Sequence, residues 1–160
     1  MLFLRQLFRG FIMSSKSKYQ RKVYWGAFIL DWFKYLQDND LTSSDYKVLF
    51  YLCENMEFKN NTVYLKQKNI ADKLNMDKGN VSKCIKRLSI KQFIVKVDQG
   101  YMINPHLFYV GKRDLESREE LREIFDEIVN SYGINPKFRM NEIEYKLEKS
   151  TESECVFFHK

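Results

Sequence analysis

The chain has 160 residues, of which 44% are hydrophobic and 16% aromatic, enough for one domain with a substantial core and some extra helix. Only six glycines and two prolines are present, which disfavours an all-β fold with many tight turns. The net charge of +6 is unevenly distributed. Residues 62–112 carry ten basic and three acidic side chains, a net +7, whereas residues 113–160 carry a net −4. A basic middle followed by an acidic end is typical of a module that faces a polyanion.

Residues 1–21 are interpreted as an N-terminal extension. The opening run MLFLRQLFRGFIM is interrupted by Arg5 and Arg9, so it is too short for a membrane span of about 20 apolar residues and lacks the form of a secretory signal. A polar, basic stretch begins at Met13, which indicates that translation starts there. A short amphipathic membrane anchor is the alternative for this run, although its apolar residues form a broad face rather than a narrow one. We expect a cytoplasmic protein with no membrane partner.

The three cysteines, Cys53, Cys84 and Cys155, are far apart and form no C-x-x-C pair. Their odd number indicates a reducing compartment without a disulfide framework. Cys53 and Cys84 fall on apolar helix faces and are predicted to be buried thiols.

Two helices are predicted before residue 62. Apolar residues at helical spacing indicate a helix over 25–37. Thr42 and Asp45 resemble a capping box that opens a second helix. The buried stripe of that helix is predicted to comprise Tyr46, Leu49, Phe50, Cys53 and Met56.

Residues 67–88 read QKNIADKLNMDKGNVSKCIKRL and fit a helix-turn-helix. Asn75 occupies the turn, because asparagine tolerates the left-handed region. Asp77 caps the second helix, whose N-terminal residues would point into the major groove of DNA. The predicted buried positions of the two helices are Ile70, Ala71, Leu74, Val81, Ile85 and Leu88.

The remaining face of the second helix carries cations and hydrogen-bonding groups but no acid. Lysine can donate to guanine O6 and N7, and asparagine can pair with adenine N6 and N7. The predicted DNA-binding residues of this face are Lys78, Asn80, Ser82, Lys83, Lys86 and Arg87.

A short strand is predicted at 62–65 and a hairpin at 93–103. The hairpin turn is Asp98-Gln99-Gly100, in which Gly100 is expected to supply a positive φ, and Asn104-Pro105 ends the second strand. A hairpin directly after the helix-turn-helix makes the motif winged, and Lys96 could reach a phosphate. The predicted fold is mainly α with a small β-hairpin wing.

The C-terminal third is predicted to contain one helix and a polar tail. Ser117 and Glu120 resemble a capping box that opens a helix over 118–132, and Gly133 is its expected C′ residue. The domain assignment is a winged helix-turn-helix over 22–112, a C-terminal helix over 113–133 and a tail over 134–160, with a short helix near 141–149. The apolar face of the C-terminal helix is Leu121, Ile124, Phe125, Ile128 and Val129.

No catalytic apparatus can be recognised in the sequence. The two histidines, His106 and His159, form no metal-binding pair, and neither zinc-ligand spacing nor a phosphate-binding P-loop occurs. His106 is expected to be a surface residue. The sequence thus predicts a protein without a cofactor, a metal or enzymatic activity.

The run from Asn60 to Asp114 resembles the RepL family of plasmid replication proteins of Gram-positive bacteria. Asn61-Thr62 starts the strand before the helix-turn-helix, the hairpin follows the recognition helix directly, and Asn104-Pro105-His106-Leu107 leads to Gly111. The resemblance extends back to about Lys22. It implies an initiator that binds its own plasmid origin and recruits host replication proteins, without nicking or unwinding DNA.

Three alternatives compete with this interpretation. A transcriptional regulator of the MarR-like winged-helix type has the same DNA chemistry, although it usually adds long dimerisation helices and a ligand pocket. A nicking enzyme would need the histidine pair that is missing here. A helical interaction module is disfavoured by the basic recognition face. The acidic helix 118–132 and the tail are the candidate surface for partner proteins or for homodimer formation.

Overall fold

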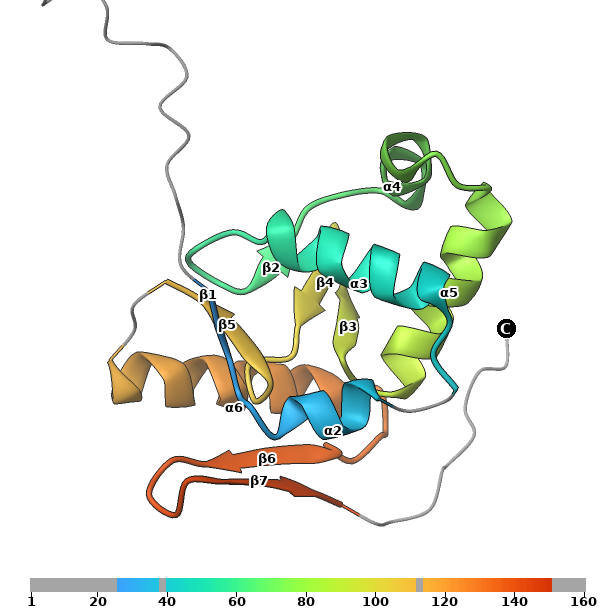
Figure 1. Cartoon of the computed structure of the whole chain (residues 1–160). Helices are drawn as coiled ribbons and strands as arrows, with labels where there is room; N and C mark the ends of the chain where they lie inside the picture. Colours follow the sequence, from blue (N-terminus) through green and yellow to red (C-terminus); the bar gives the residue numbers. More distant parts are fainter. Residues whose placement is uncertain (1–25, 38–39, 112–113, 151–160) are drawn as a thin grey trace, which may run out of the picture.

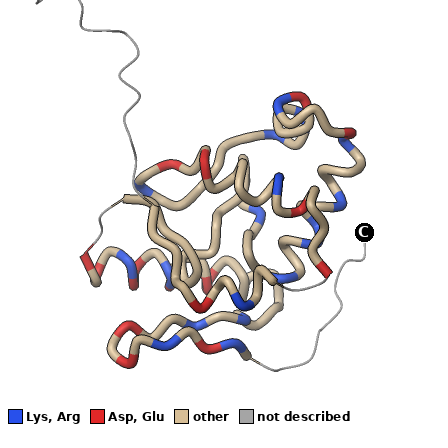
Figure 2. The backbone as a smooth tube through the Cα atoms, in the orientation of Figure 1, with Lys and Arg blue, Asp and Glu red and all other residues tan. Residues whose placement is uncertain are grey.

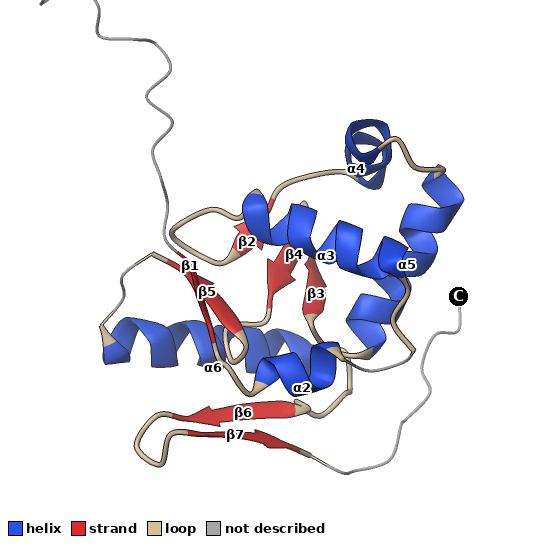
Figure 3. Cartoon of the chain, viewed as in Figure 1, coloured by secondary structure: helices blue, strands red, loops and turns tan. Residues whose placement is uncertain are grey.

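The computed structural model describes residues 26–37, 40–111 and 114–150, and within them the chain forms five helices and seven short strands (Figures 1 and 3). A three-stranded antiparallel sheet, ordered β2-β4-β3, lies between two helical layers. On one side are α3 (Ser43–Glu54), α4 (Gln67–Leu74) and α5 (Lys78–Ile90), and on the other is α6 (Leu115–Ser131). The fold is therefore mixed α/β, rather than mainly α with a single hairpin.

The predicted first helix is wrong in its first half. Residues Gly26–Phe28 form β1, which pairs antiparallel with β5 (Phe108–Val110), and only Trp32–Leu36 are helical, as α2. The β1 strand is held in place by aromatic packing, since the rings of Phe28 and Phe108 lie 4.2 Å apart. The paired residues Phe28 and Phe108 are 80 positions apart in the sequence. The spacing of apolar residues within a short segment therefore could not predict this strand.

The start of α3 is as predicted. Thr42 caps the helix, and the Asp45 carboxylate accepts a hydrogen bond from the Thr42 backbone N–H at 2.8 Å, which completes the capping box. The predicted buried stripe is only partly correct. Leu49 and Met56 are buried, but Phe50 is 49% exposed, and Val48 and Leu52 take the positions nearest the core.

The sheet consists of β2 (Thr62–Val63), β3 (Ile94–Val97) and β4 (Gly100–Ile103). The predicted hairpin is present, but Gly100 does not have a positive φ; it pairs with Val97 as a strand residue. Its hydrogen side chain is needed because β2 runs close by, and a Cβ at this position would lie 1.9 Å from the Val63 carbonyl oxygen. The turn itself consists of Asp98 and Gln99.

Side chains of β3 and β4 alternate between two cores. Ile94, Tyr101 and Ile103 face the large core beneath α3 and α5. Val95 and Met102 face the opposite side, where they meet the buried stripe of α6, namely Leu121, Phe125 and Val129. Ile124, which the sequence placed on that stripe, is 42% exposed.

The helix α6 begins earlier than predicted. Its N-cap is Asp114, whose carboxylate accepts a hydrogen bond from the Ser117 N–H at 2.8 Å, so Ser117 is inside the first turn. Gly133 has φ +72° just after the helix, as expected of a C′ glycine. No helix among the described residues is long and apolar enough to cross a membrane.

The region after α6 is a β-hairpin, not the predicted polar tail with a short helix. Strands β6 (Phe138–Asn141) and β7 (Lys146–Lys149) pair antiparallel and lie along α2 and α6 (Figure 1). Phe138 and Leu147 are buried in the large core. Several predictions fall outside the described residues: the extension 1–21 with its start at Met13, Cys155, His159 and residues 151–160.

Candidate nucleic-acid interface

Helices α4 and α5 meet through a tight turn at Asn75. This residue has φ 50° and ψ 51°, the left-handed conformation that the sequence predicted. The Met76 N–H donates to the Ala71 carbonyl at 2.9 Å, and Lys47 of α3 donates to the Leu74 carbonyl at 3.0 Å, so the end of α4 is tied to its neighbour. Asp77 then caps α5 by accepting from the Asn80 N–H at 3.1 Å.

The core side of this unit agrees with the sequence prediction. The two helices bury Ile70 and Ala71 from α4 and Val81, Ile85 and Leu88 from α5, whereas Leu74 is half-buried. Cys84 is also fully buried on this side. The side chains of α5 are thereby divided cleanly between an apolar face and a face that points away from the protein.

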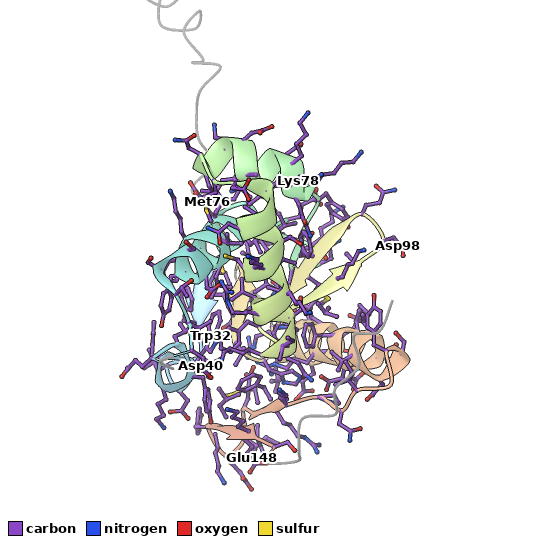
Figure 4. The ribbon with its side chains drawn as sticks, turned by 90° about the vertical axis from the view of Figure 1, so that its right-hand side faces the viewer. Trp32, Asp40, Met76, Lys78, Asp98 and Glu148 are labelled. Atoms are coloured by element: carbon purple, nitrogen blue, oxygen red, sulfur yellow. The ribbon has the colours of Figure 1, made fainter. Side chains whose placement is uncertain are left out.

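The outward face of α5 carries most of the predicted DNA-binding residues. Figure 4 shows Lys78 at the start of the helix, toward one end of the molecule, with Glu148 at the opposite end. Along α5, Figure 2 shows basic residues and no acidic ones. The exposed members of the predicted set on this helix are Lys78, Asn80, Ser82, Lys83 and Lys86.

Arg87 has a different role from the one predicted. Its Nε and NH2 atoms donate to the two carboxylate oxygens of Asp45 at 2.9 and 2.8 Å, which joins α5 to α3. Burial of Asp45 by itself raises the pKa of its carboxyl, but the hydrogen bonds from Arg87 and Thr42 outweigh burial and hold that pKa below its usual value. A guanidinium held in this way by a fully buried carboxylate is a structural group, so we remove Arg87 from the candidate DNA contacts.

The β3–β4 hairpin, predicted as a wing, lies beside the start of α4. An open cleft runs between them, lined by residues 64–67 and Asn69 on one side and by residues 96–101 of the hairpin on the other. Lys96 is exposed and faces this cleft together with Lys66, a cation that the sequence reading did not single out. The signal that could have found Lys66 is its position one residue before α4, opposite the β3–β4 hairpin.

His106 is buried, which corrects its prediction as a surface residue. Only 4% of its surface is exposed. The ring Nδ1 accepts a hydrogen bond from the Met140 N–H at 3.0 Å, so the proton is on Nε2, 3.1 Å from the Asp126 carboxylate. This histidine joins the β4–β5 turn to α6 and β6. No group of three potential metal ligands occurs among the described residues.

The two described cysteines, Cys53 and Cys84, have raised thiol pKa values. Cys84 is fully buried and Cys53 is half-buried. Burial raises the pKa of Cys53 to about 12 and that of Cys84 to about 11. The prediction of a buried thiol is confirmed for Cys84 and only partly correct for Cys53, and the raised pKa values keep both thiols protonated at neutral pH.

Comparison with known proteins gives the family. The model of the Firmicute plasmid replication protein family, RepL, matches residues 18–131, which include α2 to α6 and the three-stranded sheet. The chain belongs to the RepL family. It is also 28% identical, over 79% of its length and 71% of the relative's, to a Bacillus thuringiensis protein described as an uncharacterized 23.6 kDa protein. The family resemblance read from the sequence is thus confirmed, and the matched region ends before the β6–β7 hairpin.

Proposed function

We propose that α4, α5 and the β3–β4 hairpin form a winged helix-turn-helix that binds double-stranded DNA at a plasmid replication origin. The observation that carries the proposal is the outward face of α5, which is exposed, rich in lysine and free of acid. A helix of this chemistry fits the major groove, where lysine and asparagine can read guanine and adenine. Membership in a plasmid replication family supplies the biological setting.

The individual contacts follow from position. Asn80 and Lys83 lie one turn apart near the start of α5 and are assigned to base edges. Lys86 lies one further turn along and is assigned to the same groove. Lys78 and Ser82 complete this surface, and Lys96 on the wing and Lys66 opposite it are assigned to phosphates, because cations outside the groove position the protein without reading sequence.

In this proposal the protein acts by binding and recruitment in the cytoplasm, without nicking or unwinding DNA. Host replication proteins are the proposed partners, and the exposed acidic side of α6 is the surface offered to them or to a second copy of the chain. No cofactor or metal is required.

The test uses a minimal plasmid that carries this gene and its flanking DNA. Lys83→Ala should reduce replication, and in purified protein it should weaken binding to the flanking DNA more than to random duplex. Each lost base contact should cost roughly 1–3 kcal/mol, or about 5- to 150-fold in affinity. Lys146→Ala is the matched control, since Lys146 is exposed at the far hairpin and should change neither readout.

Three outcomes would contradict the proposal. Equal losses on specific and random DNA would mean that Lys83 contacts only phosphate. Persistence of the plasmid after deletion of the gene, with a nearby promoter becoming active, would instead identify a transcriptional regulator. A covalent protein–DNA adduct or nicked plasmid in the presence of Mg²⁺ would contradict the non-enzymatic mechanism.

A further inference from the structure

A second concave site lies at the opposite end of α5 from the proposed reading surface. It is a cavity of about 310 Å³ between the end of α5, α2 and the β6–β7 hairpin. The apolar surface open to an occupant is that of Tyr35 and of Ile90, which is 42% exposed, whereas Phe93 and Phe138 also line the cavity but are only 1% and 2% exposed. A cavity of this size can accept a large side chain.

The polar rim of this cavity is predominantly cationic. Arg87, Lys91, Lys137 and Lys149 line it, with Asp40 as the acid. These cations already have partners within the protein: the Lys137 Nζ donates to the Ile90 carbonyl at 2.9 Å, and the Lys149 Nζ lies 5.1 Å from the centre of the Tyr35 ring. Against these four cations stand the carboxylates of Asp40 and Asp45, so the rim keeps a surplus of positive charge that suits an occupant with acidic groups beside an apolar side chain.

The chain itself supplies such a segment next to the cavity. Residues 151–160 read TESECVFFHK, with Glu152 and Glu154 followed by Val156, Phe157 and Phe158. The segment begins close to the cavity, because Lys149, the last residue of β7, lines the cavity and only Ser150 separates it from residue 151. Ten residues can span up to about 33–36 Å, so the distance is easily covered.

We propose that residues 151–160 dock in this cavity, with Phe157 or Phe158 against Tyr35 and Ile90 and with Glu152 and Glu154 facing the cationic rim. The segment would then cover the end of α5 and fasten the β6–β7 hairpin to it. The proposal concerns an intramolecular contact, so it stands or falls independently of DNA binding.

The experiment measures backbone dynamics of the full chain by ¹⁵N NMR without DNA. Docking predicts that the amides of residues 156–158 have heteronuclear NOE values close to those of the folded domain. The double variant Lys91→Glu/Lys149→Glu should lower these values to those of a freely moving tail. Lys146→Glu is the matched control, because Lys146 is in the same strand as Lys149 but does not line the cavity.

A second pair of variants separates loss of docking from loss of folding. Phe157→Ala/Phe158→Ala changes only the tail and should shift the amide signals of Lys91, Lys137 and Phe138 while leaving those of α4 unchanged. Mobile amides at 156–158 in the unmodified protein would overturn the proposal. It would also be overturned if Lys91→Glu/Lys149→Glu weakened duplex binding while leaving the tail dynamics unchanged, because the cavity would then belong to the DNA interface.

Discussion

The carboxylate of Asp45 is shared between two helices: it accepts from the Thr42 backbone at the start of α3 and from the Arg87 guanidinium of α5. Asp45 is fully buried, whereas the Arg87 side chain is 35% exposed. One acid thereby fixes where α3 begins and how α5 lies across it. The orientation of the proposed DNA-reading helix depends on this pair.

Arg87→Leu is expected to act on stability. The substitution leaves the buried Asp45 carboxylate without its guanidinium partner. Breaking a fully buried ion pair lowers the free energy of unfolding by about 3–5 kcal/mol. Because Arg87 is partly exposed, we expect a somewhat smaller loss of about 2–4 kcal/mol. Urea denaturation measures the change, and a double-mutant cycle with Asp45→Asn should give a coupling energy of about 1–3 kcal/mol. A change under 0.5 kcal/mol would show that the pair does not stabilise the fold.

The pH dependence of stability should change in Asp45→Asn. Because the pKa of Asp45 is lowered in the folded state, its contribution is fully present above the unfolded value of about 3.9 and is lost as the pH falls through the folded pKa. The stability advantage of the unmodified protein over Asp45→Asn should therefore be constant from pH 7 to 5 and shrink below about pH 4. Glu144→Gln, at an exposed turn, is the control. An advantage that grows on acidification would contradict the assignment.

Gly100→Ala should disrupt the sheet. The added methyl would meet the backbone of β2, with the Val63 oxygen 1.9 Å from the new carbon, so β2 must separate from β4. Overpacking of this kind costs about 1–3 kcal/mol or more. Gln99→Ala, one residue earlier in the exposed turn, should be nearly neutral, and thermal unfolding of the two variants gives the comparison. Equal melting temperatures would be incompatible with the close approach of β2.

The thiols of Cys53 and Cys84 should resist modification in the folded protein. In a Cys155→Ser variant, a disulfide reagent at pH 8 should react slowly, because both pKa values lie well above that pH and only the thiolate attacks. Addition of urea should release both thiols to rapid reaction. Fast labelling of either cysteine without denaturant would contradict its burial.

DNA binding should weaken steeply with salt. If about six phosphates are neutralised by the cations of residues 62–112, the logarithm of the binding constant should fall against the logarithm of salt concentration with a slope of about −5. Lys96→Ala should make the slope less negative by about 1, whereas Lys146→Ala should leave it unchanged. A slope near zero would show that the cations of residues 62–112 do not contact DNA phosphates.

The unit from α4 to β4 could be predicted from sequence because its determinants are local. Asn75 in the left-handed turn, the Asp77 cap and the apolar spacing of α5 each act within a few residues. The burial of Cys84 follows from the same periodicity. Local rules also gave the capping box at Thr42 and the glycine after α6.

The predictions from sequence were wrong where segments far apart in the chain pack against each other. The strand β1 exists because Phe28 packs on Phe108, and β6 exists because Phe138 packs against Phe93 and Tyr35, with ring centres 6.0 and 5.1 Å away. Arg87 looked like an ordinary member of a basic face, because its partner lies 42 residues earlier in the chain. A single sequence carries no mark of such pairings.

The β3–β4 hairpin, the proposed wing, separates two cores, with Ile94 and Ile103 on one side and Val95 and Met102 on the other. A strand pair anchored on both faces cannot tilt unless both sets of contacts repack together. The backbone amides of β3 and β4 should accordingly exchange with solvent only through global unfolding, like those of α5. The base of the β3–β4 hairpin and α5 are therefore expected to move as one unit, and under the proposed function a bound duplex would have to adapt to a spacing that the protein sets before binding.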